Sequence, residues 1–281
     1  KYCMVERISN GVLAAEVSDI GPELYSLSKG NREYIWQRDP RFWTSSSPLL
    51  FPNVGRQKND SFIIKHRVYP IGIHGITRFL ETTLCEKSEN CLTFESRPTA
   101  QTLEAYPFDF RILSNFKIDG NTLSVYRTVF NSGNTLLPFC IGEHTGFCCD
   151  PSDALLRFEL EEKTTRAVLN RDHYIGHDEE IALKNMPLND SEFLRGAYIL
   201  RSCRSTCVSL ISKDREVLRV YRGNYPTIAI WRKPQAPFVC IETLHGFDSD
   251  ASDTEDLFAK KNLVTLYPKE KQTFTYSIAL K

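Results

Sequence analysis

The sequence FRILSNFKIDGNTLSVYRTV, residues 110–129, decides the fold class. In residues 110–118, and again in 123–129, hydrophobic and polar side chains alternate, which is the period of a β-strand with one buried face. Asp119-Gly120-Asn121 stands between the two runs and has the residue types that tight hairpin turns prefer. The stretch therefore predicts two antiparallel strands joined by a short turn.

The same alternating pattern recurs along most of the chain. Residues 61–70 predict a second hairpin, and residues 155–160 and 164–169 predict another strand pair. The polar segment 171–196 lacks a clear pattern, so we expect loops there with at most one turn of helix. The sequence contains no long amphipathic helix, phosphate-binding loop or repeat. It therefore predicts one all-β domain over residues 1–281, a large twisted antiparallel β-sandwich.

Charge and hydropathy exclude several classes of function. Lys and Arg total 35, and Asp and Glu also total 35, so the formal net charge is zero at neutral pH. Nucleic-acid and membrane-surface partners require a cationic excess, and we expect neither. No hydrophobic run approaches the roughly 20 residues that span a bilayer. The first residues also lack the layout of a signal peptide.

The nine cysteines are odd in number and scattered along the chain. We therefore expect reduced thiols in a cytoplasmic protein rather than a disulfide framework. A zinc site built from His144, Cys148 and Cys149 lacks the C-x-x-C spacing typical of such sites, so no metal is expected.

Four stretches place a polar side chain beside Gly, Pro or Asn where an apolar run ends. They offer Arg56 with Asn53, His74, His144 and Glu242. A carboxylate can take a proton from a hydroxyl, an imidazole can deliver one to an oxygen, and an arginine can hold hydroxyls. The set suits acid–base chemistry on a neutral polyhydroxylated substrate. A structural alternative also fits, in which Glu242 and Arg56 form a buried ion pair.

Five motifs, taken in order, resemble those of aldose 1-epimerases, the galactose mutarotase-like proteins, and within that family the LacX-like bacterial branch. The motifs are FPNVGR (51–56), GIHG (72–75), YPFDF (106–110), PFCIGEHTGF (138–147) and FVCIE (238–242). The resemblance implies a β-supersandwich and an isomerase that interconverts the α and β anomers of a free hexose without a cofactor. It implies a small-molecule sugar as the partner of a monomer or homodimer.

The resemblance also implies roles for single residues. Glu242 matches the family's general base, which takes the proton from the anomeric hydroxyl. His144 matches the general acid, which protonates the ring oxygen. His74 matches a second histidine that supports the ring and its charge. Arg56 matches the arginine that holds sugar hydroxyls, and Asn53 belongs to the same substrate-binding motif.

The chain departs from the family pattern at three places. Glu143 precedes the acid histidine where glycine is usual, and on a strand it should point to the opposite face, as an innocuous substitution. Thr243-Leu244 follows the base in place of Pro-Trp, which removes an aromatic wall. Gly196 stands where the family has an aspartate, and we expect Asp190 or Glu192 nearby as candidate replacements.

Two other functions stay open. A hexose-phosphate epimerase of the same fold needs extra cations at the pocket, and Lys58, Arg78 and Arg232 are available. A carbohydrate-binding or regulatory protein with little turnover needs no acid–base pair. For any of these functions, Trp43 is a candidate surface on which a sugar ring stacks.

Overall fold

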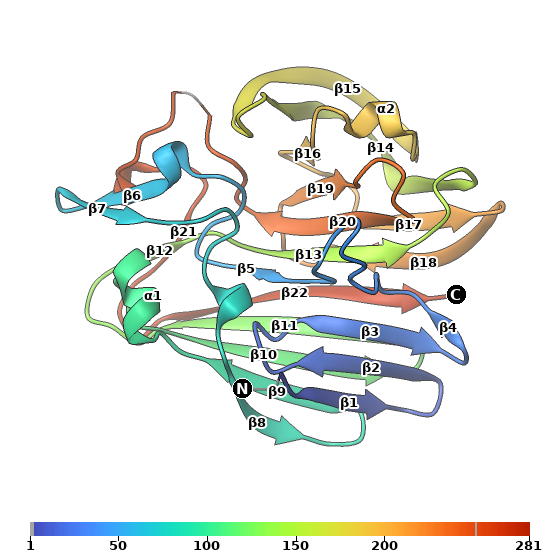
Figure 1. The fold of residues 1–281 in the computed structure, drawn as a ribbon, viewed down its shortest axis with the longest axis horizontal. Coiled ribbons are helices and arrows are strands. Elements are labelled where there is room, and N and C mark those ends of the chain that lie inside the picture. The colour runs from blue at the N-terminus through green and yellow to red at the C-terminus, as the bar shows by residue number, and fades with distance from the viewer. Residues whose placement is uncertain (1–2, 251) are drawn as a thin grey trace.

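Figure 1 shows the chain as a computed structural model that describes residues 3–250 and 252–281. Antiparallel sheets dominate it. An N-terminal sheet of four strands lies against one end of a much larger sheet. Its strands are β1 (Val5–Ser9), β2 (Leu13–Ser18), β3 (Leu24–Lys29) and β4 (Arg32–Glu33).

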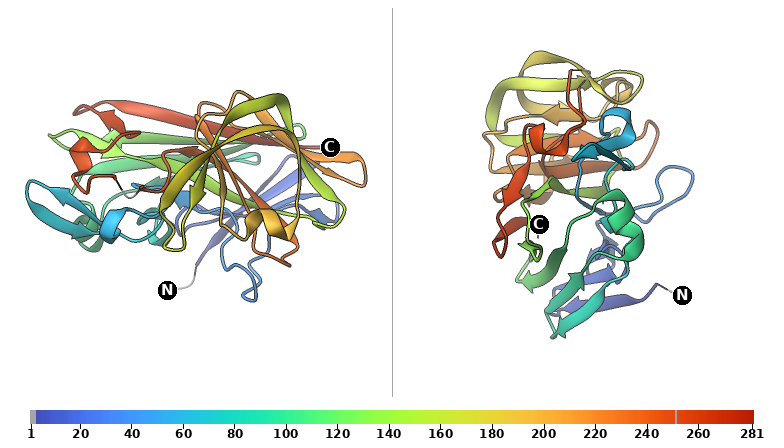
Figure 2. Two further views of the ribbon diagram at one scale, coloured as in Figure 1. Left: turned by 90° about the horizontal axis from the view of Figure 1, so that it is seen from above. Right: turned by 90° about the vertical axis from the view of Figure 1, so that its left-hand side faces the viewer.

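The large sheet holds fourteen strands within the described residues. In order across the sheet they are β5 (Leu49–Leu50), β13 (Ile141–Cys148), β20 (Phe238–His245), β19 (Thr227–Trp231), β16 (Tyr198–Leu200), β14 (Ala154–Leu169), β17 (Cys207–Ser212), β18 (Arg215–Tyr221), β22 (Lys271–Leu280), β11 (Thr122–Asn131), β10 (Phe110–Asp119), β9 (Cys91–Ser96) and β8 (Thr83–Lys87), with β15 (Ile175–Pro187) paired to β14. The sheet twists strongly, so the strands at the β14–β15 end run steeply across those around β22 (Figure 2). The predicted all-β fold with a large twisted antiparallel sheet is confirmed.

Smaller elements complete the structure. Two short sheets are β6 (Ser61–Ile64) with β7 (Arg67–Pro70), and β12 (Leu137–Phe139) with β21 (Val264–Leu266). The α-helices of the described residues are α1 (Ala100–Ala105) and α2 (Asp190–Phe193), and short 3-10 turns cover Lys58–Asp60, Thr77–Phe79 and Leu257–Ala259. In the part of the chain that the structure describes, no helix is long and apolar enough to cross a membrane.

Both predicted hairpins form. β10 and β11 pair from Phe110 with Asn131 to Asp119 with Thr122, and β6 pairs with β7. Alternate residues of β10 and β11 are buried, because one face of this part of the sheet packs on the core and the other is largely solvated. Local alternation and turn residues were sufficient to predict this part of the fold.

Two predictions about the middle of the chain are wrong. Residues 155–160 and 164–169 belong to one strand, β14, and do not pair with each other. Glu162, where a turn was expected, is buried and accepts hydrogen bonds from the main-chain N–H groups of Arg204 and Ser205. The expected loop at 171–196 contains β15, an edge strand whose side chains are mostly exposed or half-buried, so its hydrophobic pattern is weak.

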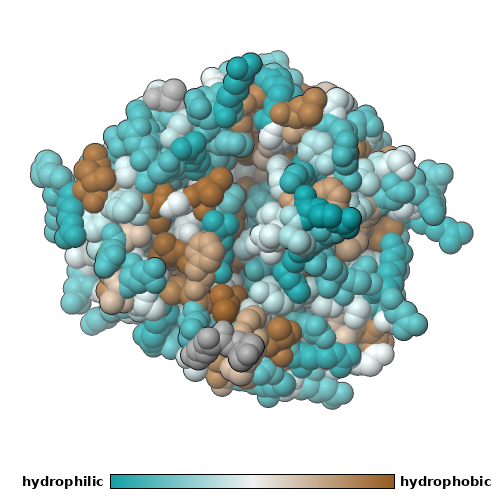
Figure 3. All heavy atoms as spheres, viewed as in Figure 1, coloured by the Kyte–Doolittle hydropathy of each residue, from teal (hydrophilic) through white to brown (hydrophobic). Residues whose placement is uncertain are grey.

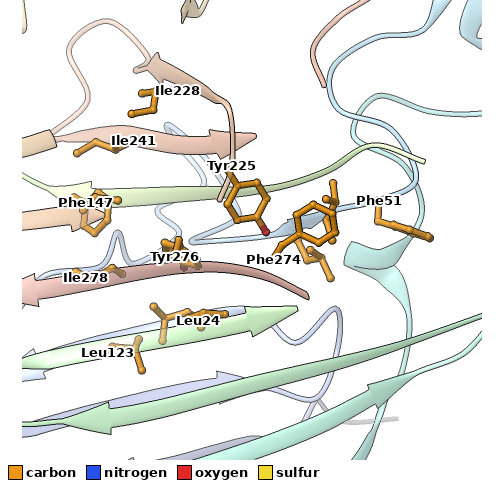
Figure 4. Packing of buried hydrophobic residues seen from close by; sticks show 14 of the residues in the cluster. Leu24, Phe51, Leu123, Phe147, Tyr225, Ile228, Ile241, Phe274, Tyr276 and Ile278 are labelled. Carbon is orange, nitrogen blue, oxygen red and sulfur yellow. The ribbon is translucent and has the colours of Figure 1, made fainter. Parts of the chain in front are cut away.

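The core lies between the two layers, where side chains from distant segments meet (Figure 4). Leu24 of β3 faces Leu123 of β11, and Phe147 of β13, Ile241 of β20 and Phe274 of β22 continue the same cluster. Each is at most 1% exposed. Burying a side chain of this size stabilises the fold by roughly 1.5–3 kcal/mol. Outside the core, polar side chains cover most of the face in Figure 3, as expected for a chain with 25% charged residues.

β13 and β20 are buried on both faces, from Ile141 to Phe147 and from Phe238 to Leu244. Successive strand residues point to opposite sides. One side of the β13–β20 pair, with Phe147 and Ile241, therefore belongs to the core of Figure 4. The opposite side of the pair carries the candidate site.

Candidate active site

His144 and Glu242 are direct partners across the β13–β20 pair. Opposed residues on antiparallel strands lie on the same face of the sheet. Nε2 of His144 is 3.4 Å from Oε1 of Glu242, and both side chains are less than 10% exposed. Nδ1 of His144 is buried and has no hydrogen-bond partner in the described residues. The fold thus brings the predicted acid and base together, 98 residues apart in the chain.

The two side chains line a cavity of about 280 Å³. Its walls are mostly apolar and aromatic, with a few charged or titratable groups, which is typical of small-ligand sites. The residues that line it are Trp43, Pro48, Val54, Ile73, His74, Arg78, His144, Leu169, His173, Gly196, Ala197, Ile199, Ala229, Trp231, Glu242, Leu244 and Asp248.

The glycines on either side of His144 make room for side chains that enclose it. A Cβ on Gly146 would lie 3.0 Å from the ring of Trp43, and a Cβ on Gly142 would lie 2.5 Å from Leu244. The Trp43 ring lies over the His144 ring with their centroids 4.8 Å apart, and the Trp231 ring is 5.7 Å away. These rings exclude water from one side of the imidazole.

His74 reaches the same cavity from a loop. Its ring centroid is 5.4 Å from that of His144. The main-chain N–H of Gly55 donates a hydrogen bond to Nδ1 of His74 at 3.1 Å. A neutral imidazole that accepts at Nδ1 carries its proton on Nε2. The loop therefore fixes His74 as a hydrogen-bond donor through Nε2.

Burial controls the protonation of the site. Burial, with a smaller contribution from the charge of Arg78, lowers the pKa of His144 to about 4. Burial also raises the pKa of Glu242 to about 8, with a smaller contribution from the charge of Asp248. For His74, burial and then the neighbouring His144 hold the pKa well below 6.5. Buried titratable groups with strongly shifted pKa values in a cavity are typical of acid–base sites.

Arg56 and Asn53 are not among the residues that line this cavity. The Arg56 guanidinium binds the carboxylate of Asp60 at 2.8 and 2.7 Å and the carbonyl oxygen of Asp172 at 2.7 Å. It faces an adjoining open depression that shares Ile73 and His173 with the cavity. The Asn53 amide donates to the carbonyl oxygens of Gly55 and Gly72, so it holds two loops together. The structural alternative of an Arg56–Glu242 ion pair does not form.

Sequence reasoning missed several residues of the cavity wall, and three of them matter most for its chemistry. Arg78, considered only for a phosphorylated substrate, lines the cavity, and its buried Nε has no partner in the described residues. Asp248 adds a second carboxylate, and Trp231 adds an aromatic wall that Leu244 does not provide. Arg78 and Asp248 lie outside the strands, where no periodic signal indicates the direction of a side chain. The one sequence signal that could have indicated Asp248 is its position six residues after Glu242.

The departures from the family pattern have specific structural outcomes. Glu143 does point to the face opposite His144, but there its carboxylate forms a buried ion pair with Arg127, so the substitution is not innocuous. Asp190 pairs with Arg232, and Glu192 lies 4.0 Å from Arg166. Neither Asp190 nor Glu192 lines the cavity.

The cysteines lie apart from this chemistry. All nine are free thiols, and Cys148 donates to the carbonyl oxygen of Ile35. Among residues 3–250 and 252–281, no group of three or more His, Cys, Asp or Glu side chains is placed to hold a metal ion. The zinc alternative of His144 with Cys148 and Cys149 is therefore not formed.

Comparison with known proteins identifies the class to which this fold and cavity belong. The sequence profile of the aldose 1-epimerase family matches residues 4–278. The chain therefore belongs to the aldose 1-epimerase family, whose enzymes are isomerases that act on sugars. The family resemblance inferred from the five motifs is confirmed.

Individual relatives cover the whole length of the chain. The plasmid and chromosomal LacX proteins of Lactococcus lactis subsp. lactis are each 27% identical over 300 residues, with 99% of both sequences covered. A galactose mutarotase related enzyme from Lactobacillus acidophilus has a TM-score of 0.95 at 26% identity, covering 99% of this chain and 97% of its own. A galactose mutarotase-like protein from Lactobacillus casei has a TM-score of 0.93 at 25% identity, covering 99% and 100%.

Proposed function

We propose that this protein is an aldose 1-epimerase that interconverts the α and β anomers of a free hexose. The observation that carries the proposal is the buried cross-strand pair of His144 and Glu242, 3.4 Å apart in a cavity of sugar size. A pair that holds one proton between two sites suits a reaction that removes one proton and returns one.

The reaction requires no net change in protons. Between pH values of about 4 and 8 the proton of the pair rests on Glu242, and it must first pass to His144. The Glu242 carboxylate then takes the proton from the anomeric O1 hydroxyl, and the His144 imidazolium gives its proton to the ring oxygen O5. The C1–O5 bond breaks as the C1–O1 bond becomes a carbonyl. Rotation about C1–C2 presents the other carbonyl face, and the ring closes with the two proton transfers reversed. Each group contributes about 10²–10⁴-fold to the rate.

The rest of the cavity positions the sugar in this account. His74 donates through Nε2 toward the ring, and the guanidinium of Arg78, which lines the cavity, offers the cationic donor that the sequence assigned to Arg56. Trp43 and Trp231 supply apolar faces for the sugar's C–H surface.

A phosphorylated hexose is a second candidate substrate. Beside the cavity lies an open depression that shares Leu169, His173 and Gly196 with it and is also lined by Arg171 and Arg195. Guanidinium groups in a depression beside the cavity suit a phosphate on the far end of a hexose. One of these cations, Arg195, is paired with Glu179 at 3.0 Å, which weakens the case.

Exchange NMR of the anomeric protons tests both substrates in one experiment. We expect the protein to speed α–β exchange in D-glucose or D-galactose more than in glucose 6-phosphate. A larger effect on the phosphate ester would favour the second candidate. Sugar binding without any acceleration would instead support a carbohydrate-binding protein and contradict both epimerase proposals.

A further inference from the structure

The cavity contains a second carboxylate that the acid–base reaction does not use. Asp248 lies in the loop that follows β20 and lines the cavity together with Glu242 and Arg78. It is 9% exposed. A carboxylate that is largely removed from water destabilises a fold unless something compensates its charge, so its position calls for an explanation.

The loop around Asp248 is built to hold this carboxylate in place. The main-chain N–H of Arg56 donates to Oδ1 of Asp248 at 2.8 Å, and the N–H of Ser249 donates to the carbonyl oxygen of Arg56 at 2.9 Å. Gly55 has a φ of +64°, and a Cβ on it would lie 2.2 Å from the carboxylate carbon. A side chain at position 55 would therefore displace Asp248.

A structural ion pair does not account for Asp248. Arg56 pairs with Asp60 at 2.7 Å, Lys260 pairs with Asp253 at 3.6 Å, and Arg78, on the wall of the same cavity, is not within ion-pair distance of Asp248 in the described residues. The Arg56 N–H occupies one of about four acceptor positions on the carboxylate. The remaining positions are available to a donor that enters the cavity.

We propose that Asp248 is a substrate-binding carboxylate, which accepts a hydrogen bond from a sugar hydroxyl. This inference rests on the proposed epimerase function and deepens it. Asp248 would supply a carboxylate to the cavity wall, which Gly196, on the wall of the same cavity, cannot. The FPNVGR loop then acts through its main chain, since its N–H groups hold both His74 and Asp248.

Charge gives Asp248 an effect that a purely structural residue would lack. The titratable and charged groups that line the cavity with Glu242 are His144 from β13, His74 and Arg78 from the segment between β7 and β8, Asp248, and His173 from the loop before β15. The negative charge of Asp248 raises the pKa of Glu242. Removing that charge must shift the alkaline limb of the activity profile to lower pH.

The test compares Asp248→Asn with wild type by polarimetry at pH 7.5 and across pH. Asparagine keeps an acceptor for the Arg56 N–H, so the loop is retained while the charge is lost. We expect KM for the preferred hexose to rise about 10- to 100-fold, the range for a hydrogen bond to a charged group. The alkaline limb should also move to lower pH. Asp150→Asn, an exposed carboxylate in a distant turn, is the matched control and should change neither quantity.

A panel of monodeoxy hexoses adds a readout that does not depend on how stable the variant is. Wild type should discriminate most strongly against the sugar that lacks the hydroxyl bound by Asp248, and Asp248→Asn should lose that discrimination. If the wild type is active and Asp248→Asn has the same KM, the same alkaline limb and the same deoxy-sugar pattern, the role of Asp248 is overturned while the proposed function stands. A wild type that accelerates no aldose would overturn the proposed function and, with it, this inference.

Discussion

Glu143→Gln tests the buried ion pair that stands behind the site. Glu143 and Arg127 are each about 1% exposed, with Nε–Oε1 and Nη2–Oε2 distances of 2.8 and 2.9 Å. Arg127 also donates to the carbonyl oxygen of Pro22 in the turn between β2 and β3, and the Tyr225 hydroxyl donates to Glu143 at 3.4 Å. Because Glu143 precedes His144 on β13, this network fixes the strand that carries His144 against β11 from the opposite face.

The magnitude follows from leaving Arg127 buried without a counter-charge. Glutamine has nearly the same volume as glutamate, so no cavity forms and the change is electrostatic. Removing one partner of a buried pair costs about 3–5 kcal/mol. That is a large part of the roughly 5–15 kcal/mol that keeps a typical domain folded. With a urea slope of about 3 kcal/mol per molar, the unfolding midpoint should fall by roughly 1 M or more.

Urea unfolding at pH 7, followed by tryptophan fluorescence, measures this change. The control is Glu6→Gln, which breaks the surface pair with Lys87 and should cost about 0–1 kcal/mol. The double variant Arg127→Met, Glu143→Leu should recover much of the lost stability, because it removes both charges together. The reasoning is refuted if Glu143→Gln shifts the midpoint no more than Glu6→Gln does.

Three further predictions concern the site itself. Between pH values of about 4 and 8, set by the pKa values of His144 and Glu242, the pair holds one proton, so activity should form a plateau there. Activity should decrease at pH values below this range, where Glu242 and His144 are both protonated, and at pH values above it, where the pair loses its last proton. A polarimetric rate that rises steadily with pH would contradict this. Trp43→Ala should raise KM by about 2- to 10-fold with a smaller effect on kcat, through loss of ring stacking. Steady-state kinetics measures both constants, with Trp43→Phe as the control that keeps an aromatic ring. A larger effect on kcat than on KM would mean that the ring acts in the chemistry. Arg56→Ala should change kcat/KM less than about threefold, since its guanidinium binds Asp60 outside the cavity while its main-chain N–H is kept; a loss of tenfold or more would mean that the guanidinium reaches the sugar.

The sequence predicts those parts of the fold in which local pattern and tertiary environment agree. The hairpin at 110–129 has alternation, a tight turn and one buried face, and all three indicate the same structure. β15 could not be predicted, because an edge strand solvated on both faces has no hydrophobic period to detect. The continuity of β14 depends on hydrogen bonds to Glu162 from residues more than 40 positions away.

The same distinction holds for the site. His144 and Glu242 stand on apolar strands, and once those strands pair, the register brings the side chains together. Asp248, Arg78 and the direction of Arg56 depend on irregular loops, where the sequence does not specify which way a side chain points. The 51–56 motif indicated the correct loop but not the atoms: main-chain N–H groups of this loop, rather than its guanidinium, reach the groups that line the cavity.

The most direct test of the central claim is polarimetry of freshly dissolved α-D-glucose and α-D-galactose with wild type, Glu242→Gln and His144→Ala. The account predicts that wild type speeds equilibration of at least one sugar, and that both variants fall toward the uncatalysed rate while remaining folded by circular dichroism. A folded Glu242→Gln variant that keeps wild-type activity would contradict the assignment of Glu242 and His144 as the base and acid.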